Sequence, residues 1–436
     1  MSWIKYIIPF ICISALAQEE ALLTLSDAVK ITLENDFDIQ IIENNVEISK
    51  NNATRMANGY LPIVTGTAGL SGNTADADYT LLSDGTTGSY NTESQSLNAG
   101  VALNYTLFDG MQRAYNYQKS QKLLNLSKIQ AEQVIEGTLL RLFNTYYNVA
   151  ALSENVNVQV QTLNISKDRL LRVKTKADYG QITQLEVLNA QVDVNNDSIN
   201  LLNTIQQLNN TKRDLNLLLQ RKLEYAFTVD TSLIFNLNNP VDTLVSQAIA
   251  YNKQVKISEQ NNVISDYNVK ISKTGYLPKV NLSSSYGYNK QDANYGQYET
   301  QSSLGLSAQL GLSWNLFDGG RTHVATQNAK VQVLNSQLSY QQLLLQVKRD
   351  VTNAYTSFQN AIFVLEAEQT NLITGLRNFE RSKEQYELGQ ITALEFRQAQ
   401  QNLLFAKTKY NAAKYSAKIY ELSVHQLTGK LLEQKF

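Results

Sequence analysis

The stretch LGLSAQLGLSWNL at residues 304–316 alternates large apolar residues with small or polar ones. A period of two places successive side chains on opposite faces of a β-strand. One face consists of leucines, an alanine and a tryptophan, while the other carries only glycine, serine, glutamine and asparagine. Strands of about ten residues with this pattern are typical of membrane β-barrels. A soluble β-sandwich with one solvated face is the alternative.

Three further stretches, over about 61–72, 96–107 and 279–289, show a similar alternation. Aromatic residues lie near the strand ends, and Trp and Tyr prefer the headgroup level of a membrane. These residues are Tyr60, Phe108, Tyr276, Tyr288, Trp314 and Phe317. After the N-terminal segment, no stretch approaches the roughly 20 apolar residues of a membrane helix. We therefore expect any membrane crossing to be made by strands.

Residues 1–17, MSWIKYIIPFICISALA, combine a lysine, an apolar run and an Ala-Leu-Ala ending. This pattern predicts a secretory signal peptide cleaved after Ala17. A membrane anchor is the alternative, although the apolar run is short for one. Cys12 is the only cysteine and would be removed with the signal. We therefore expect no disulfide, no Cys-based metal site and no cysteine nucleophile.

The chain contains an internal duplication. The motifs GYLP, LFDG and GQIT each occur twice and in the same order. Each copy is expected to form an entering helix, two strands, a long helix and a return helix. The predicted segments are a signal peptide (1–17), a first repeat (18–226), an inter-repeat linker (223–240), a second repeat (241–430) and a C-terminal tail (431–436).

Long stretches without proline predict long helices. The long helices are expected over 111–178 and 320–388, the return helices over 182–222 and 391–430, and the entering helices over about 25–58 and 241–274. Between Val351 and Phe379, apolar residues recur at alternating steps of four and three. This heptad pattern predicts a coiled coil between neighbouring helices.

The number of strands bears on the oligomeric state, because four strands are too few for a closed barrel. An open sheet in lipid would leave edge N–H and C=O groups unpaired, at several kcal/mol each. Copies of the chain must therefore share one barrel. The polar face has little bulk and would fill an eight-stranded barrel poorly. We therefore predict a trimer with twelve strands.

In its LFDG, GYLP and GQIT motifs and their duplication, the sequence resembles the TolC-type outer-membrane factor family over essentially the whole mature chain. The resemblance implies a homotrimer in the outer membrane of a Gram-negative bacterium, in contact with outer-membrane lipid. Four strands per chain would form a twelve-stranded β-barrel, continued by a twelve-helix coiled-coil α-barrel in the periplasm. A small mixed belt would form around 223–240 and the C-terminus.

The resemblance also implies a passive exit duct for efflux or type I secretion. Its partners would be a periplasmic adaptor (membrane fusion) protein and an inner-membrane pump driven by protons or ATP. The two GQIT turns would be the periplasmic tips that contact the adaptor. The tip residues are Gly180, Gln181, Ile182, Thr183, Gly389, Gln390, Ile391 and Thr392.

Both turns carry signals for ending one helix and starting the next. Gly180 and Gly389 permit the positive φ that ends a helix. Thr183 and Thr392 each have a glutamate three residues later, which predicts a T-x-x-E capping box at each turn. The glutamates, Glu186 and Glu395, could therefore serve only as helix caps.

The resemblance places acidic residues inside the mouth, six and nine positions after each turn glycine. Glu186 and Glu395 occupy the first position, while Asn189 and Gln398 occupy the second and are neutral. A ring of glutamates would favour cationic solutes. We therefore predict one acidic layer in the periplasmic aperture, gated by the helix tips.

The resemblance also assigns a charged tie across this mouth. The family's arginine two positions after the second turn glycine is Ile391 here. Its tyrosine three positions before that glycine is kept as Tyr386. We expect a closed mouth with fewer charged ties, or with different ones.

The FDG motifs mark the change from strand to helix. They contain Asp109 and Gly110 in the first repeat and Asp318 and Gly319 in the second. We expect both aspartates to cap the long helices rather than to act in catalysis.

The composition argues against other classes of function. Lys and Arg total 38 and Asp and Glu 39, so a general nucleic-acid partner has no support. His323 and His425 lie in helical stretches without an acid–thiol or metal-ligand pattern, and no serine elbow or phosphate-binding loop is evident. We expect no enzyme, no cofactor and no metal site. The alternative to a duct is a secreted coiled-coil scaffold or adhesin without a channel.

Overall fold

The computed structural model describes residues 21–294 and 298–433. The predicted signal peptide, 1–17, and the last residues of the predicted tail, 434–436, lie outside this part of the chain. The chain divides into two compact units. Among the described residues, the sheet unit consists of 41–133, 253–294 and 298–346, and the helical unit consists of 21–40, 134–252 and 347–433.

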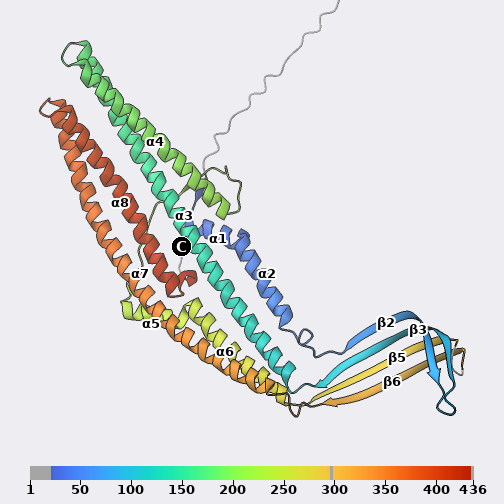
Figure 1. The fold of residues 1–436 in the computed structure, drawn as a ribbon. Coiled ribbons are helices and arrows are strands. Elements are labelled where there is room, and N and C mark those ends of the chain that lie inside the picture. Colours follow the sequence, from blue (N-terminus) through green and yellow to red (C-terminus); the bar gives the residue numbers. More distant parts are fainter. Residues whose placement is uncertain (1–20, 295–297, 434–436) are drawn as a thin grey trace, which may run out of the picture. The chain divides into compact units, whose positions relative to one another are not determined.

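The sheet unit is built around a four-stranded antiparallel sheet with the order β2-β3-β5-β6 (Figure 1). The strands are β2 (Ile63–Thr80), β3 (Thr87–Phe108), β5 (Lys279–Ala293) and β6 (Thr300–Ser313). Each repeat contributes one hairpin, and the pairing of β3 with β5 joins the two hairpins. β2 and β6 are therefore the edges of this sheet.

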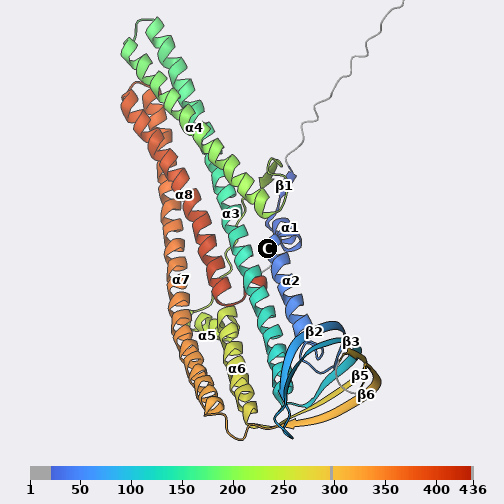
Figure 2. The same ribbon diagram turned by 45° about the vertical axis from the view of Figure 1, so that its right-hand side comes forward.

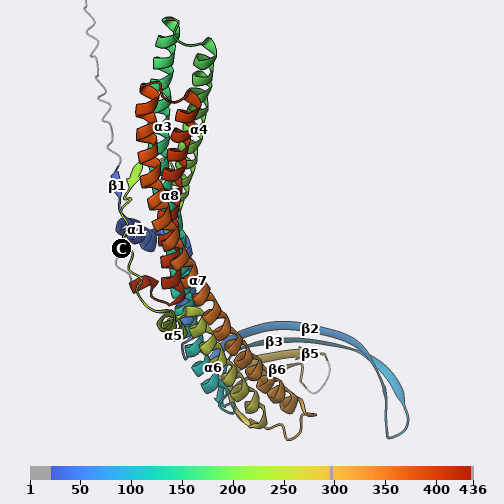
Figure 3. The same ribbon diagram turned by 90° about the vertical axis from the view of Figure 1, so that its left-hand side faces the viewer.

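The hairpin of the first repeat is longer than the strands expected over 61–72 and 96–107. β2 and β3 stay paired as far as Thr80 and Thr87, through polar residues where the apolar alternation has ended. Beyond the pair of Ser94 with Ala293, β3 pairs with β2 alone. The resulting ribbon continues past the ends of β5 and β6 (Figure 3).

The last strand is shorter than the expected 304–316 at its C-terminal end. β6 ends at Ser313, which pairs with Lys279, the first residue of β5. Pro278 precedes that residue and has no N–H to extend the ladder. Residues 314–316 therefore have no partner strand.

The chain forms two helical hairpins of equal length, whose turns and return helices belong to the helical unit. α3 (Gln112–Asp178) and α7 (Arg321–Glu387) have 67 residues each, and α4 (Gln184–Leu218) and α8 (Ala393–Leu427) have 35 each. α4 runs back along α3, and α8 runs back along α7 (Figure 2). The return helices are shorter than the expected 182–222 and 391–430 at both ends. The first two residues of each range belong to the turns, and the helices end at Leu218 and Leu427. The structure thus keeps the sequence duplication as matched helix lengths.

The helices expected over 25–58 and 241–274 are each broken once. The observed helices are α1 (Leu25–Asn35), α2 (Phe37–Asn52), α5 (Val241–Tyr251) and α6 (Lys253–Lys273), followed by the short helix η1 (Thr274–Tyr276). The breaks lie at Asp36 and Asn252, whose backbones have ψ near 130°. The carboxylate of Asp36 accepts a hydrogen bond from the N–H of Ile39 at 3.1 Å and so starts the next helix.

The core of the helical unit gathers around buried aromatic residues of α3 and α8. β1 (Ala21–Leu23) pairs in parallel with β4 (Phe227–Val229), which lies within the expected linker. The Tyr146 hydroxyl donates to the carbonyl of Leu23 at 2.8 Å and accepts from the N–H of Asp230 at 3.1 Å. Burial raises the pKa of Tyr146 to about 12, so this hydroxyl remains a donor at neutral pH. One side chain therefore ties α3 to both short strands.

None of the helices in 21–294 and 298–433 combines the length and the apolar character that a membrane-spanning helix needs.

Candidate functional site at the hairpin tips

The two turns of the helical unit have the same backbone geometry. Gly180 has φ +72° and Gly389 has φ +71°. After Gly180, the N–H of Gln181 donates to the carbonyl of Lys176 at 2.9 Å. After Gly389, the N–H of Gln390 donates to Gln385 in the same way, at 2.8 Å. These hydrogen bonds close a Schellman motif, which ends a helix on a left-handed residue.

The helix starts after the two turns differ, although the sequence predicted a capping box at both. At the second turn the Thr392 hydroxyl accepts from the N–H of Glu395 at 3.2 Å, and the carboxylate accepts from the N–H of Thr392 at 2.7 Å. At the first turn Thr183 makes no side-chain cap hydrogen bond. The expected capping box of Thr183 and Glu186 is therefore wrong.

The physical reason lies in the surroundings of Glu186. This residue is half-buried and lines a pocket of about 320 Å³ together with Arg169 and Asp193 of the same hairpin and Arg397 of α8. Glu395, in contrast, is exposed. Hydrogen bonds from the backbone N–H and then the hydroxyl of Thr392 lower the pKa of Glu395. The two glutamates, equivalent in sequence, thus occupy different environments.

The other expected aperture residues are also dissimilar. Asn189 and Gln398 are exposed, and the Gln398 amide donates to the Asn402 side chain at 2.9 Å. Tyr386 packs within the second hairpin, where its ring stacks on Phe396 at a centroid distance of 4.8 Å. Burial raises the pKa of Tyr386. The structure therefore places this tyrosine in a helix–helix contact.

The tip residues themselves are open to solvent. Ile182 and Ile391 are half-buried, and the rest are exposed: Gly180, Gln181, Thr183, Gly389, Gln390 and Thr392. In each turn the isoleucine points its apolar side chain toward its own hairpin, as shown by the packing of Ile182 and Ile391 against buried clusters of hydrophobic residues. The side chains of Gln181, Thr183 and Gln390 are therefore exposed at the ends of the hairpins.

A buried polar network, absent from the sequence-based expectations, joins the two hairpins. Arg397 of α8 donates from Nη1 and Nη2 to the two carboxylate oxygens of Asp197 on α4, at 2.8 and 2.7 Å. Ser166 of α3 also donates to Asp197, at 2.5 Å. Gln400 of α8 donates to Ser166 at 2.8 Å and to the carbonyl of Thr162 at 3.0 Å. Side chains from three helices thus meet at one carboxylate.

Two further charges complete this inter-hairpin network, which consists of Ser166, Arg169, Asp193, Asp197, Arg397 and Gln400. Asp193 is ion-paired with Arg169 and lies 3.4 Å from Nε of Arg397. Two arginines therefore face two aspartates. Burial alone would lower the pKa of Arg397, but the hydrogen bonds and negative charges of Asp197 and Asp193 raise it.

The charged side chains of this network are largely buried, so they need partners. The side chain of Asp197 is 0% exposed and that of Arg397 is 14% exposed. A charge removed from water is tolerated only when it is paired and hydrogen-bonded. Removal of one partner would therefore leave the other charge buried and unpaired, which is strongly destabilising.

Closer to the turns, a second tie links the hairpins. Nη1 of Arg172 on α3 donates to the carboxylate of Glu387 on α7 at 2.5 Å. The hydrogen bond from Arg172 lowers the pKa of Glu387. Both side chains are partly exposed, so salt would weaken this tie.

One arginine of the inter-hairpin network has N–H groups that make no hydrogen bond within the described part of the chain. Arg169 is 4% exposed, and its Nε and Nη1 have no hydrogen-bond partner among the described residues. Both Arg169 and Glu186 line the 320 Å³ pocket. The carboxylate of Glu186 is therefore an acceptor within the same cavity as these two donors.

The FDG motifs belong to the sheet unit. Asp109 accepts from the N–H of Arg113 at 2.9 Å, and Asp318 accepts from the N–H of Thr322 at 2.8 Å. The following residues, Gly110 and Gly319, both have φ +69°. Both carboxylates thus accept from the first turn of a long helix. Within 21–294 and 298–433, no group of three or more His, Cys, Asp or Glu could hold a metal ion.

A family model described as outer membrane efflux protein matches the chain twice, over residues 28–220 and 244–430. The two matches coincide with the two repeats and with the two helical hairpins. Curated protein sequences gave no match to the chain.

Solved structures share the fold at low sequence identity. The CmeC outer membrane channel of Campylobacter jejuni is 18% identical, with a TM-score of 0.75 over 93% of this chain and 86% of that chain. The open state of the MtrE outer membrane channel of Neisseria gonorrhoeae is 15% identical, with a TM-score of 0.70 over 93% and 89%. The outer membrane protein VceC of Vibrio cholerae is 15% identical, with a TM-score of 0.68 over 93% and 96%.

Proposed function

This chain belongs to the outer membrane efflux protein family, and we propose that it forms the exit duct of a tripartite efflux or type I secretion system. It is an outer-membrane protein, and its family and fold are those of channel proteins rather than enzymes. The duct would conduct solutes passively from the periplasm or an inner-membrane pump to the outside. The pump would be driven by protons or ATP.

The edges of the sheet support assembly into a trimer. β2 and β6 each lack a second partner strand within the described chain. Because all neighbouring strands are antiparallel, β6 runs opposite to β2. The β6 of one copy can therefore continue the same antiparallel pairing with the β2 of the next. Closure removes the unpaired N–H and C=O groups that lipid does not tolerate, and three copies supply twelve strands.

A stripe on α4 supports the same assembly. Five apolar side chains on this helix, each between 55% and 65% exposed, are spaced by three, four, seven and three residues: Leu185, Leu188, Val192, Ile199 and Leu202. Such spacing places them on one face of the helix. A helix of a neighbouring copy would cover this face and complete the coiled coil.

In this proposal the inter-hairpin network holds the periplasmic mouth closed. The family's arginine is replaced by Ile391, and Arg397, six residues later, supplies the charge instead by binding Asp197. Glu186, Glu395, Asn189 and Gln398 would line the aperture, and Tyr386 would brace the second hairpin. Loss of the network would allow the hairpins to separate and the mouth to widen.

The exposed tips are the proposed contact with the periplasmic adaptor protein. Each chain offers two turns of the same geometry, so a trimer would offer six. The helix caps nonetheless differ, because the cap of Thr392 is made and that of Thr183 is not. The two turns of a chain would therefore present nearly equivalent but distinguishable surfaces.

The observation that carries the proposal is the match of one channel family to both repeats of a chain whose sheet has two open edges. The test is disulfide trapping between copies in native membranes. With Cys12 replaced by serine, Thr65→Cys on β2 is combined with single cysteines at 303, 305, 307 or 309 on β6. A closed barrel gives a covalent trimer for at least one combination.

The matched controls are the single-cysteine variants, which can give no more than dimers. Purification of a stable, water-soluble monomer without detergent, released with the periplasmic contents, would contradict the duct. That outcome would favour the secreted scaffold or adhesin.

A further inference from the structure

One face of the four-stranded sheet carries no charged side chain over most of its height. The strand register places residues of the same face in rows across β2, β3, β5 and β6. Three consecutive rows are Thr65–Ala102–Ser285–Ser307, Thr67–Gly100–Gly287–Gly305 and Gly69–Asn98–Asn289–Ser303. From Asn281 to Gln291 of β5, every row on this face contains only uncharged residues.

The charged residues of the strands avoid this face. Asp76 and Asp78 of β2, Glu93 of β3, and Lys290 and Asp292 of β5 all fall on the opposite alternation. The exception is Lys279, in the first pair of β5 with β6. β6 contains no charged residue.

The opposite face has the character expected toward lipid. Leu70, Val101, Tyr286 and Leu306 lie on it and are between 52% and 78% exposed in the single chain. A membrane barrel turns its apolar face outward and its polar face toward the lumen. If the sheet closes as proposed, the uncharged face is the wall of the pore.

The middle of this face is a groove whose floor is glycine. Gly100, Gly287 and Gly305 are neighbours in register, and Thr67 completes their row. A Cβ on Gly100 would lie 3.0 Å from the Cα of Gly287 and from the carbonyl oxygen of Tyr286, so a larger residue would not fit without backbone movement. The cavity at this row has a volume of about 450 Å³, and its lining also includes Tyr286, Tyr288, Leu304 and Leu306 of the other alternation.

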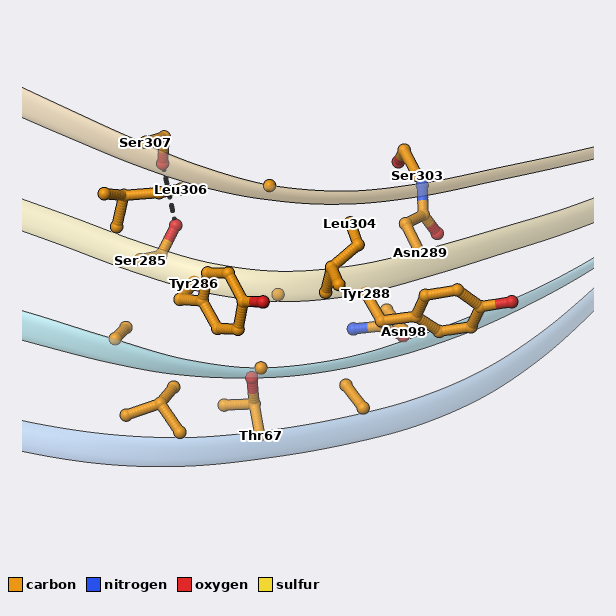
Figure 4. A pocket seen from close by; sticks show the side chains of 16 residues that line it. Thr67, Asn98, Ser285, Tyr286, Tyr288, Asn289, Ser303, Leu304, Leu306 and Ser307 are labelled. Atoms are coloured by element: carbon orange, nitrogen blue, oxygen red, sulfur yellow. Dashed lines mark hydrogen bonds between the residues drawn. The ribbon is translucent and has the colours of Figure 1, made fainter.

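Hydroxyl and amide groups border this groove (Figure 4). On one side, the hydroxyls of Ser285 and Ser307 are hydrogen-bonded to each other at 2.8 Å. On the other side lie Asn98, Asn289 and Ser303. These groups both donate and accept hydrogen bonds, so the wall can replace part of the hydration of a polar solute of either charge.

From this arrangement, and resting on the proposed trimeric pore, we infer that the sheet section of the duct accepts polar organic solutes regardless of the sign of their charge. A wall without fixed charges sets up no field that enriches one ion over another. The polar groups of its glycine-floored groove offer solutes neutral hydrogen bonds and no charge. Any charge preference of the whole duct then arises outside the rows from Asn281 to Gln291, at Lys279 or at the glutamates of the mouth.

The inference is tested by reversal potentials of the purified full-length protein in planar bilayers under a KCl gradient. The Glu186→Gln, Glu395→Gln, Lys279→Gln triple variant should show a cation-to-anion permeability ratio of about 1, because it removes the mouth glutamates and the one charged residue of this face. In that background, Ser285→Asp should raise the ratio about fourfold and Ser285→Lys should lower it about fourfold. This estimate assumes three charges about 10 Å from the pore axis at moderate salt.

Two control variants distinguish the effect of charge on this face from the effects of side-chain size and of charge on the opposite face. Ser285→Asn changes the size of the same side chain without charge, and Lys290→Gln removes a charge from the opposite face. Both should leave the ratio unchanged. A marked preference in the triple variant, or conducting pores whose reversal potential ignores both Ser285→Asp and Ser285→Lys, would overturn the inference while the duct stands. Absence of any conductance in the unmodified protein would overturn the duct and this inference together.

Discussion

Replacing Asp197 with asparagine would open the proposed mouth. Asp197 is fully buried, accepts two hydrogen bonds from Arg397 and one from Ser166, and joins three helices. Asparagine has nearly the same shape but no charge, and its amide nitrogen cannot accept from the guanidinium. The substitution therefore leaves Arg397 with one lost partner atom and with an incompletely balanced charge beside Asp193.

The size of the effect follows from burial. Breaking a buried ion pair by removing one partner costs about 3–5 kcal/mol. Because the asparagine oxygen still accepts one hydrogen bond and Asp193 remains nearby, we take about 3 kcal/mol for each chain. At about 1.4 kcal/mol per tenfold change, the ratio of closed to open hairpins falls by about 100-fold.

The assay is the open probability of single channels in planar bilayers, with the melting of the trimer in detergent as a second readout. Asp178→Asn, an exposed aspartate at the end of α3, is the matched control and should change neither. A double variant of Asp197→Asn with Arg397→Gln should be less impaired than the sum of the single variants, because no unpaired charge is left. An open probability for Asp197→Asn equal to that of the Asp178→Asn control would refute the role of the network.

Three smaller effects should follow from the same unit. Because hydrogen bonds from Thr392 lower the pKa of Glu395 below its ordinary value of 4.5, the capping box is complete above that value and is lost as the pH falls through the lowered pKa. The protection factor of the Thr392 amide, whose N–H donates to the Glu395 carboxylate at 2.7 Å, should fall as the pH drops through the lowered pKa, and a protection factor that stays constant on acidification would contradict the cap. Gly389→Ala should destabilise the trimer by about 1 kcal/mol because φ is positive there. Gly137→Ala within α3, where a Cβ meets no atom within 4 Å, should stabilise the trimer by a similar amount. Thermal unfolding in detergent distinguishes the two signs. Tyr146→Phe should cost about 1–2 kcal/mol, because the buried Leu23 carbonyl and the partly buried Asp230 N–H lose their hydrogen-bond partner. An unchanged melting temperature would show that these groups find water instead.

The spacing of apolar residues along the sequence predicted much of the architecture. The strand around 304–316 and the hairpins around the two turn glycines were predicted because alternation and heptad spacing record which faces are buried. The break at Asp36 was not predicted, since a single side chain capping the next helix leaves only a weak signal in a helical stretch. The extension of β2 and β3 beyond the apolar alternation was not predicted either. Their polar outer parts pair through the backbone, which the side-chain pattern does not report.

The inter-hairpin network shows where sequence patterns stop being informative. Asp193 and Asp197 are four residues apart and Arg397 and Gln400 are three apart, so each pair lies on one helix face. Polar residues have this spacing on solvent-exposed helix faces as well as on buried ones, so the spacing does not distinguish the two. Which faces meet depends on how α8 packs against α3 and α4, and no local pattern encodes that packing. The same limit explains the capping boxes, because Thr183 and Thr392 have equivalent motifs and differ only in what surrounds their glutamates.

The matched helix lengths constrain how such a chain can evolve. Deleting a single residue from α7 alone would turn all that follows by about 100° and shift it by about 1.5 Å relative to its counterpart α3. Such a change would swing Arg397 out of reach of Asp197 and set one tip behind the other. Amino-acid substitutions leave the helix lengths unchanged, so the sequences of the two repeats can diverge one residue at a time. Insertions and deletions in the helices should survive only in pairs or in whole heptads.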